Sequence, residues 1–477
     1  MSLKTSAMGT ALKYTLRYVK QNPEENLTKI LNLAESLFPE RYKENLRVAR
    51  TYLEPGGVYH PLIMRVFNEV DPVFLERLAY NFFINELAIG VQKQIDTEKK
   101  YGFPGPFTIL ISPTMRCNLF CVGCYAGLYT REDDMPPELF DRIIREGEEL
   151  GTYLYTILGG EPFVYPHLFE VAKNHPDVVF HTFTNGTLLT NPKMIEQLKE
   201  VGNIVPVISI EGWEKETDQR RGAGMFANIV KVMDTLKANG IPFGVSITYT
   251  RLNADTVTSD EFYDFLIDKG ALFGWYFLFM PVGKDPDTSL MPTPEQRKKL
   301  YETVQRVRLE KPLFIMDFWG DAPYVGGCIA GGRRYIHINP KGDVEPCIFV
   351  HFSTDNVKEK SLKEALSSDF MKAIRAHQPF NDNLLLPCQI IDNPDKLREI
   401  VEKTHPKPTH EGAEVIVVDD NIKSFLDEYS KEVKEVFDGI WKERYLTNPA
   451  VKGYAEKLYQ EREQKLKKFE EEHKEDT

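Results

Sequence analysis

The sequence predicts an α/β fold in which a partial parallel barrel follows a helical region and precedes an irregular extension that ends in helices. Three observations lead to this fold class. Short β-rich segments alternate with amphipathic helical segments from residue 107 to about residue 280, which is the rhythm of right-handed βαβ units. Roughly the first 100 residues show only helical periodicity. Beyond about residue 315 the pattern becomes irregular.

The N-terminal helical region is expected to span residues 1–103. One of its helices should begin at Asp71 and Pro72, because an acidic N-cap followed by proline at the first helical position is a start signal. The segment YGFPGP, which is rich in glycine and proline, ends the region.

The barrel region is expected to span residues 104–315. Six βα units predict a partial, TIM-like (β/α)6 barrel, in which active groups lie on the loops after the carboxyl ends of the strands. Strands are expected in FTILIS, YLYTIL, VVFHTF, IVPVISI, FGVSITYT and WYFLFM, with helices at 136–150, 166–173 and 192–201 between the earlier ones.

Two further regions follow the barrel. Residues 316–400 are irregular and contain three of the six cysteines. Residues 401–477 are predicted to form a helical region and a tail. The apolar positions of one long helix in it are Phe425, Tyr429, Val433, Val436, Phe437, Ile440 and Trp441.

Composition and charge exclude several classes of protein. The chain has 477 residues and a formal net charge of -12, so it lacks the basic surface that nucleic-acid binding requires, and no nucleic-acid partner is expected. Its first residues have no signal-peptide pattern, and no segment approaches the roughly 20 apolar residues of a membrane span. Six cysteines in such a chain suit metal binding or catalysis in a reducing compartment, which predicts a cytoplasmic protein.

The segment MRCNLFCVGCYAG places Cys117, Cys121 and Cys124 on the loop after the first predicted strand. A closed zinc site or a fully ligated iron–sulfur cluster needs four protein ligands, whereas three thiolates leave one metal position open. The alternatives from other classes are a zinc knuckle completed by a distant His or Cys, and an iron–sulfur protein that only transfers electrons.

The order of motifs after these cysteines resembles that of the radical S-adenosylmethionine superfamily. From residue 107 to about 280 the chain has CxxxCxxC, GGEP, TNGTLL, and ISIEG followed by RRGAG, each after a predicted strand. A zinc knuckle would not be followed by this set. The resemblance implies a 4Fe-4S cluster on the three cysteines, S-adenosylmethionine as cofactor, and an external electron donor such as flavodoxin or ferredoxin.

The activity that the resemblance implies is radical chemistry. S-adenosylmethionine would be cleaved reductively to a 5′-deoxyadenosyl radical, which removes a hydrogen atom from an unactivated substrate carbon. Such radical chemistry, of the oxidoreductase or transferase type, is oxygen-sensitive, so an anaerobic or facultative host is expected. The exact reaction and its catalytic residues are unknown from the motifs.

The GGEP motif supplies the first residues expected at S-adenosylmethionine. In the family the equivalent backbone and acid hold the methionyl ammonium, which implies this role for Gly159, Gly160 and Glu161. Glycines at a strand end also let backbone come close to a ligand. The alternative is an ordinary turn at the end of a strand.

Three further residues are carried over from the family. Asn185 is expected to border the nucleoside, Ser209 to contact the ribose hydroxyls, and Arg221 to bind the methionyl carboxylate bidentately. Arg220 competes with Arg221 for that role. An ordinary turn at Asn185 and a core hydroxyl at Ser209 are the alternatives.

The sequence departs from the family at the third cysteine. Much of the family has an aromatic residue before it that packs on the adenine, whereas this chain has Gly123 there and Tyr125 just after the cysteine. The adenine contact is therefore not assigned, and Tyr125 is as well explained as a core residue.

A second set of cysteines, Cys328, Cys347 and Cys388, lies in the irregular region. C-x13-G-x4-C, with a hairpin turn expected at Gly342, resembles the first half of the SPASM extension that carries auxiliary iron–sulfur clusters. Because a full SPASM domain has seven cysteines, this chain is expected to hold one auxiliary cluster at most, nearer the shorter twitch type. The fourth ligand would have to be a non-cysteine side chain, solvent or the substrate. His351 is a candidate by its proximity in the sequence, although a lone histidine is more often structural. The alternative is three buried, unligated thiols.

The substrate is predicted from the helical region. Lys13, Arg17 and Lys20 form a basic stripe on the first helix, as on helices that lie on anionic membranes, and the region is rich in large apolar residues. An apolar helical cover over the barrel would suit a lipid or another apolar substrate with a peripheral membrane contact. A plain helical cap on the barrel is the alternative for the stripe, and peptide or protein maturation is the alternative for the substrate.

Overall fold

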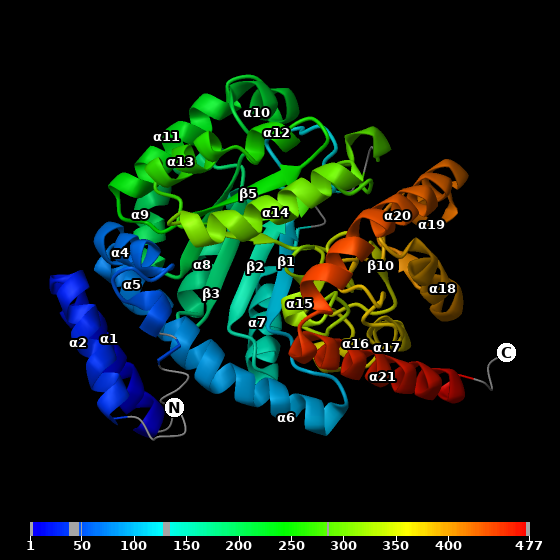
Figure 1. Cartoon of the computed structure of the whole chain (residues 1–477), viewed down its shortest axis with the longest axis horizontal. Coiled ribbons are helices and arrows are strands. Elements are labelled where there is room, and N and C mark those ends of the chain that lie inside the picture. The colour runs from blue at the N-terminus through cyan, green and yellow to red at the C-terminus, as the bar shows by residue number, and fades with distance from the viewer. Residues whose placement is uncertain (1–2, 38–46, 49, 127–133, 284–285, 474–477) are drawn as a thin grey trace.

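A nine-stranded sheet forms the centre of the structure, a computed structural model that describes residues 3–37, 47–48, 50–126, 134–283 and 286–473 (Figure 1). The strand order is β7-β6-β5-β4-β3-β2-β1-β8-β9. β1 to β7 pair in parallel, β8 is parallel to β1, and β9 is antiparallel to β8. The strands are β1 (Thr108–Thr114), β2 (Leu154–Gly159), β3 (Val179–Thr184), β4 (Ile204–Ser209), β5 (Gly244–Tyr249), β6 (Phe273–Leu278), β7 (Phe314–Asp317), β8 (Tyr335–Ile338) and β9 (Val344–Glu345).

This sheet confirms the predicted fold class. The six expected strands are present as β1 to β6, and β7 is a further parallel strand that sequence analysis did not separate from the irregular region. The barrel is partial, because β7 and β9 each have one neighbour in the sheet. The segments between the strands include α7 (Pro137–Leu150), η3 (Pro162–Val164), α8 (Leu168–Asn174), η4 (Thr187–Thr190), α9 (Pro192–Val201), α10 (Glu214–Arg221), α11 (Met225–Ala238), α12 (Ala254–Val257), α13 (Asp260–Asp268), η5 (Thr288–Leu290) and α14 (Pro294–Glu310).

The helices between the strands pack an apolar face on the outside of the sheet. In α7 the residues Phe140, Ile143 and Ile144 are fully buried, and the hydroxyl of Tyr155 in β2 donates to the carbonyl of Ile144 at 2.7 Å. Each large apolar side chain buried in this way contributes roughly 1.5–3 kcal/mol. The core therefore lies mainly between the strands and their helices.

The N-terminal segment is helical, as predicted, and one helix begins at Asp71. The Asp71 side chain accepts a hydrogen bond from Val73 N at 2.9 Å, and Pro72 occupies the first helical position. Figure 1 shows α6 along the lower edge of the molecule, below α7, with α1 and α2 on the side away from the C-terminal helices. The N-terminal helices are α1 (Leu3–Gln21), α2 (Pro23–Leu37), α4 (His60–Glu69), α5 (Pro72–Ala79), the π-helix η1 (Tyr80–Gly90) and α6 (Val91–Tyr101).

These helices close the end of the barrel where the strands begin. The last carbonyls of a helix have no partner within it, so they need donors from elsewhere. Side chains of the N-terminal helices supply such donors for carbonyls at the ends of several barrel helices, or between such a helix and the next strand. The pairs are Arg65 with Ile267, Ala271 and Pro312, Arg77 with Val201, Asn81 with Pro176 and Val178, Asn85 with Asp177, and Gln94 with Gly151. We call this part of α4 to α6 the floor of the barrel.

The basic stripe on α1 is bound within the protein. Lys13 and Arg17 both pair with Glu76 of α5, at 3.2 and 2.5 Å, and Lys20 Nζ donates to the carbonyl of Val70 at 2.7 Å. These contacts favour the helical cap over the membrane contact as the explanation of the stripe. Among the helices of the described residues, none has the length and apolar character that a membrane crossing requires.

The C-terminal part consists of short strands and helices packed beside the barrel. β8 and β9 form the predicted hairpin, and Gly342 in its turn has a φ of +91°. The predicted long amphipathic helix is present as α20. The elements are α15 (Ala322–Val325), β10 (Phe352–Ser353), α16 (Leu362–Leu366), α17 (Asp369–Ala376), α18 (Pro394–Thr404), β11 (Lys407–Pro408), α19 (Val415–Val418), α20 (Asp420–Ile440), η6 (Trp441–Tyr445) and α21 (Pro449–Glu472).

Candidate active site

A large cavity of about 1980 Å³ runs through the inside of the barrel. At the carboxyl ends of the strands it is lined by the loop that carries Cys117, and at the other end by Leu78 and Phe82 of the floor. Between them it is lined mainly by apolar side chains that point inward from the strands. The barrel interior is therefore open rather than filled by its own side chains.

The loop after β1 brings Cys117, Cys121 and Cys124 to the cavity. The Cys117 Sγ accepts a hydrogen bond from Leu119 N at 3.4 Å, and Asn185 Nδ2 lies 3.7 Å from the same sulfur. All three thiols are free. Their chemistry and their common loop fit a cluster with one open iron.

Gly123 fits the tight packing of this loop. It has a φ of +62°, and a Cβ at this position would lie 2.4 Å from the ring of Phe279. Side chains rarely adopt this backbone conformation, and the ring of Phe279 already fills the adjacent space. This explains why the chain has no aromatic residue before the third cysteine.

The glycines of GGEP bring the loop after β2 against the cysteine loop. Gly160 N donates to Thr114 O at 3.1 Å, and a Cβ on Gly160 would lie 2.2 Å from the carbonyl oxygen of Arg116. Both Gly159 and Gly160 line the cavity. Their lack of a side chain is thus required by backbone packing as well as by the predicted ligand.

Glu161 is fully buried and joins two loops. Its carboxylate accepts hydrogen bonds from Phe163 N at 3.1 Å, Thr184 Oγ1 at 2.7 Å and Asn185 N at 2.8 Å. Burial raises the pKa of this carboxyl, and the three donors oppose the rise. Because all three contacts are within the protein, the structure shows a positioning role, and its contact with a methionyl ammonium stays a prediction.

Asn185 and Ser209 both line the cavity at the carboxyl ends of β3 and β4. The amide of Asn185 donates to Asn118 Oδ1 at 2.9 Å, so it also holds the cysteine loop. Ser209 pairs with Ser246 of β5 in the sheet. The cavity thus brings together the residues that were predicted to border the nucleoside.

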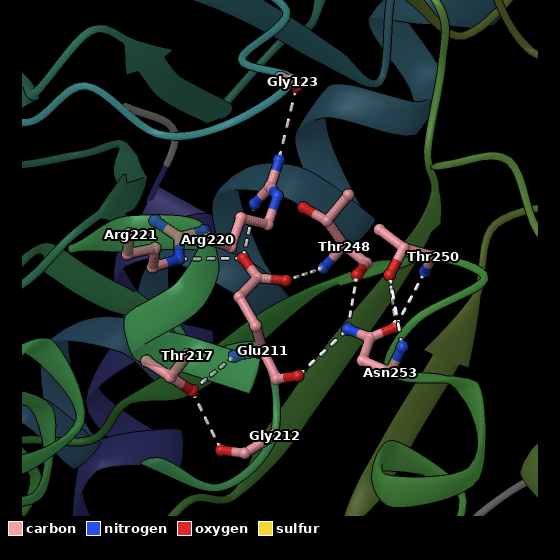
Figure 2. Close-up of polar contacts among 9 residues, drawn as sticks. All are labelled: Gly123, Glu211, Gly212, Thr217, Arg220, Arg221, Thr248, Thr250 and Asn253. Atoms are coloured by element: carbon pink, nitrogen blue, oxygen red, sulfur yellow. Dashed lines mark hydrogen bonds and ion pairs between the residues drawn. The ribbon is translucent and has the colours of Figure 1, made fainter. Parts of the chain in front are cut away.

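Glu211 binds both candidate arginines (Figure 2). Its Oε1 accepts from Arg220 Nη1 at 2.6 Å and from Arg221 Nε at 2.8 Å, and only 1% of its side chain is exposed. Thr248 N donates to its Oε2 at 3.2 Å. Figure 2 shows that Asn253 links the Glu211 backbone to β5. Sequence analysis missed Glu211, although it stands in ISIEG directly after β4.

The two arginines differ in their other contacts. Arg220 Nη2 lies 3.5 Å from Gly123 O, and its own carbonyl accepts from Val122 N at 2.9 Å, so it holds the cysteine loop. Arg221 contacts Glu211 through Nε and Nη2, and among the described residues no hydrogen bond is made by its Nη1. Both line the cavity. Arg221 is therefore better placed to bind a carboxylate.

Tyr125 lies between the two cysteine regions. Its hydroxyl donates to Gly159 O at 3.1 Å, and its ring meets Phe349 edge to face at 5.9 Å. Burial raises its pKa far above the usual range. These contacts fit the core-residue alternative.

Cys328, Cys347 and Cys388 converge around Tyr335. The Tyr335 hydroxyl donates to Cys347 Sγ at 3.0 Å. Burial raises the pKa of Tyr335 well above its usual value, and all three thiols contribute to the rise. Backbone N–H groups donate to Cys347 and Cys388 at 3.5 and 3.4 Å. Nothing in the sequence pointed to Tyr335 other than its position seven residues after Cys328.

His351 is not placed as a ligand for these thiols. Its Nδ1 contacts His410 Nε2, and its Nε2 lies 2.8 Å from Ile348 O. Burial lowers its pKa to about 4. Both ring nitrogens have partners within the protein, which favours a structural role for His351 over the role of fourth ligand.

In the described part of the chain, no three His, Cys, Asp or Glu side chains are grouped closely enough to hold a metal ion. An iron–sulfur cluster is larger than a single ion, so this finding does not test a cluster at either cysteine set.

Family models match two segments of the chain. The model of the radical SAM superfamily matches residues 111–266, and the SPASM model, an iron–sulfur cluster-binding domain, matches residues 328–389. The second match includes all three later cysteines.

Several characterised proteins are similar in sequence. The mycofactocin maturase MftC of Mycobacterium ulcerans is 32% identical over 52% of this chain and 70% of its own length. The AdoMet-dependent heme synthase of Methanosarcina barkeri is 25% identical over 53% of this chain and 79% of its own length. The PqqA peptide cyclase of Ruegeria pomeroyi is 26% identical over 55% and 74%.

Two solved structures share the fold. Streptococcus suis SuiB bound to its precursor peptide SuiA has a TM-score of 0.50 and 19% identity, over 63% of this chain and 70% of that chain. The enzyme anSMEcpe with bound AdoMet has a TM-score of 0.50 and 17% identity, over 70% and 98%. At these identities the likeness concerns the fold alone.

Proposed function

Because this chain belongs to the radical S-adenosylmethionine superfamily and has a SPASM-type region, we propose that it modifies an apolar side chain of a peptide or protein. It is a radical SAM enzyme whose cofactors are S-adenosylmethionine, the 4Fe-4S cluster of the superfamily and the auxiliary iron–sulfur chemistry of a SPASM domain. The printed names of its relatives, a maturase and a peptide cyclase among them, support a peptide substrate.

The observation that carries this proposal is the cavity. It extends from the three cysteines into a barrel interior that is lined mainly by apolar side chains. A substrate side chain that enters it would be enclosed and shielded from water, as radical chemistry requires. An apolar side chain suits such a lining best.

The residues at the site would have distinct roles in binding the cluster and S-adenosylmethionine. Cys117, Cys121 and Cys124 would hold the cluster, and Arg221 would bind the methionyl carboxylate with the guanidinium edge that Glu211 leaves available. When bound, the cluster and S-adenosylmethionine supply a 5′-deoxyadenosyl radical.

The remaining contacts would keep this arrangement in place. Glu161 would hold the loops after β2 and β3 against each other through its three hydrogen bonds. An external electron donor is expected.

A lipid, the first expectation from the sequence, is the second candidate. The apolar cavity would also suit an acyl chain, but the basic stripe that supported a membrane contact is bound to Glu76 and to carbonyls of the floor helices. The names of the relatives favour the peptide.

Deuterium transfer tests the proposal. The anaerobic enzyme is incubated with S-adenosylmethionine, dithionite and either a peptide fraction or a lipid extract from host cells grown in deuterated medium. We expect deuterium in 5′-deoxyadenosine with the peptide fraction only, and none with the Cys124→Ala variant. Deuterium from the lipid extract alone would reject the peptide substrate, and no 5′-deoxyadenosine at all would reject the activity.

A further inference from the structure

Two polar side chains lie in the apolar barrel without hydrogen-bond partners. His181 of β3 lines the cavity, and among the described residues none makes a hydrogen bond with its ring. The indole Nε1 of Trp275, on β6, is buried and also lacks a partner in the described part of the chain. Buried polar groups are usually satisfied, because an unsatisfied donor or acceptor destabilises the folded state. Their presence here requires an explanation.

These two side chains meet across the barrel. β4 and β5 lie between β3 and β6 in the sheet, yet the rings of His181 and Trp275 are 6.1 Å apart. Val205 and Ser246, which face the cavity from the two intervening strands, are small enough to leave this space open. The pair is therefore built across the interior and does not arise from neighbouring strands.

Aromatic rings surround the imidazole. The ring of His181 lies 5.0 Å from Phe183 and 5.5 Å from Phe273. Burial lowers the pKa of His181 to about 4, so the imidazole is neutral at pH 7 and can both donate and accept a hydrogen bond. No charged group contributes to this pKa shift, so nothing nearby would compensate an ion bound here.

Ser246 lies between Trp275 and Ser209, the residue predicted to contact the ribose. In the sheet it pairs with Trp275 on one side and with Ser209 on the other. It lines the cavity, and in the described chain its hydroxyl has no hydrogen-bond partner. Polar groups therefore continue from the predicted ribose contact into the barrel.

We propose that His181, Trp275 and Ser246 form a substrate-binding site that takes a neutral hydrogen-bonding group carried on a bulky apolar side chain. The inference rests on the proposed function and names the substrate residue more closely. The aromatic walls would bind the apolar part, and the three polar groups would select a side chain whose far end can donate or accept a hydrogen bond.

Small aromatic probes test the site in the anaerobically reconstituted full-length enzyme. Isothermal titration would compare p-cresol, toluene and 4-methylbenzoate, which share a ring but end in a hydroxyl, a methyl group or a carboxylate. A net hydrogen bond is worth about a 3- to 10-fold difference in affinity. We expect p-cresol to bind about 3- to 10-fold more tightly than toluene, and 4-methylbenzoate to bind more weakly than p-cresol.

Variants separate hydrogen bonding from packing. His181→Phe and Trp275→Phe keep aromatic contacts and should abolish the preference for p-cresol, whereas Met316→Leu, also in the cavity lining, should retain it. Because the ring of His181 makes no hydrogen bond with the described residues that His181→Phe could lose, the Tm of this variant should equal or exceed that of the wild type. A lower Tm for this variant would assign His181 to packing and overturn the inference.

The wild-type enzyme also provides a decisive negative outcome. Equal binding of p-cresol and toluene would overturn the site, as would a preference that survives in His181→Phe. If S-adenosylmethionine is still cleaved in that case, the radical activity stands and only the substrate-binding inference fails.

Discussion

Arg221 donates two hydrogen bonds to one oxygen of Glu211, from Nε at 2.8 Å and from Nη2 at 2.5 Å. Glu211 is almost fully buried, and Arg221 has only 10% of its side chain exposed. The guanidinium is thus held in a fixed orientation beside the cysteine loop. Because both of these contacts leave Nη1 without a hydrogen bond among the described residues, the geometry supports the prediction that Arg221, and not Arg220, binds the methionyl carboxylate.

Arg221→Ala should weaken S-adenosylmethionine binding by about 10- to 100-fold while the iron content stays at the wild-type value, because a charge-assisted hydrogen bond is lost. Arg220→Ala is the matched control and should lower the iron content, since Arg220 holds the backbone of the cysteine loop. Equilibrium dialysis and iron analysis measure the two effects. The reverse pattern would exchange the roles of the arginines.

Glu211→Ala should destabilise the fold by about 3 kcal/mol or more, because it leaves two partly buried guanidinium groups without their shared carboxylate. Anaerobic urea unfolding of the wild type and the variant measures the difference. A change below about 1 kcal/mol would show that the arginines find other partners.

Replacing Cys117, Cys121 or Cys124 by Ala should abolish production of 5′-deoxyadenosine, because two thiolates cannot retain the cluster. Assays with dithionite under anaerobic conditions measure the product. Wild-type activity in any one of the three variants would contradict the assignment of these residues as ligands.

The variant that lacks Cys328, Cys347 and Cys388 should contain less iron and sulfide than the wild type. The wild type should contain more than four irons per chain, because the auxiliary cluster adds to the iron of the 4Fe-4S cluster. Tyr335→Phe should keep this iron but change the electron paramagnetic resonance spectrum or the potential of the auxiliary cluster, since the hydrogen bond to Cys347 is lost. Identical iron contents in the wild type and the triple variant would exclude an auxiliary cluster.

Glu86 predicts a pH dependence of stability. It lies in the floor, accepts from Tyr153 N at 2.8 Å and Gln94 Nε2 at 2.9 Å, and burial raises its pKa from 4.5 to about 7. Between these values the folded state binds more protons than the unfolded state, so stability should fall as pH rises from about 4.5 to about 7. The total is at most about 3 kcal/mol.

Glu86→Gln should remove most of this dependence, measured by urea unfolding at several pH values in that range. A variant with the same slope as the wild type would assign the pH dependence to other groups. Glu148, whose pKa is also raised by burial, should contribute to the pH dependence in the same direction, and Glu148→Gln measures that contribution separately.

Local patterns in the sequence were sufficient to predict the succession of strands along the chain and the two sets of cysteines. Alternating and helical periodicities are properties of neighbouring residues, so β1 to β6 and α20 could be predicted without knowing what they contact. β7 was missed, because Phe314–Asp317 is a short edge strand without a distinct pattern. The spacing of Cys117, Cys121 and Cys124 indicated the chemistry, because one loop carries all three thiols.

Only the tertiary structure decided what distant side chains do. Glu211 binds both arginines, and Glu76 binds Lys13 and Arg17. His351 contacts His410. The partners in each of these contacts are separated along the sequence by other residues or whole helices. The opening of the barrel, and the meeting of β3 and β6 side chains across it, depend on how the whole sheet curves. A sequence pattern specifies which face of an element is apolar, but the partner of a polar side chain depends on packing between segments far apart in the chain.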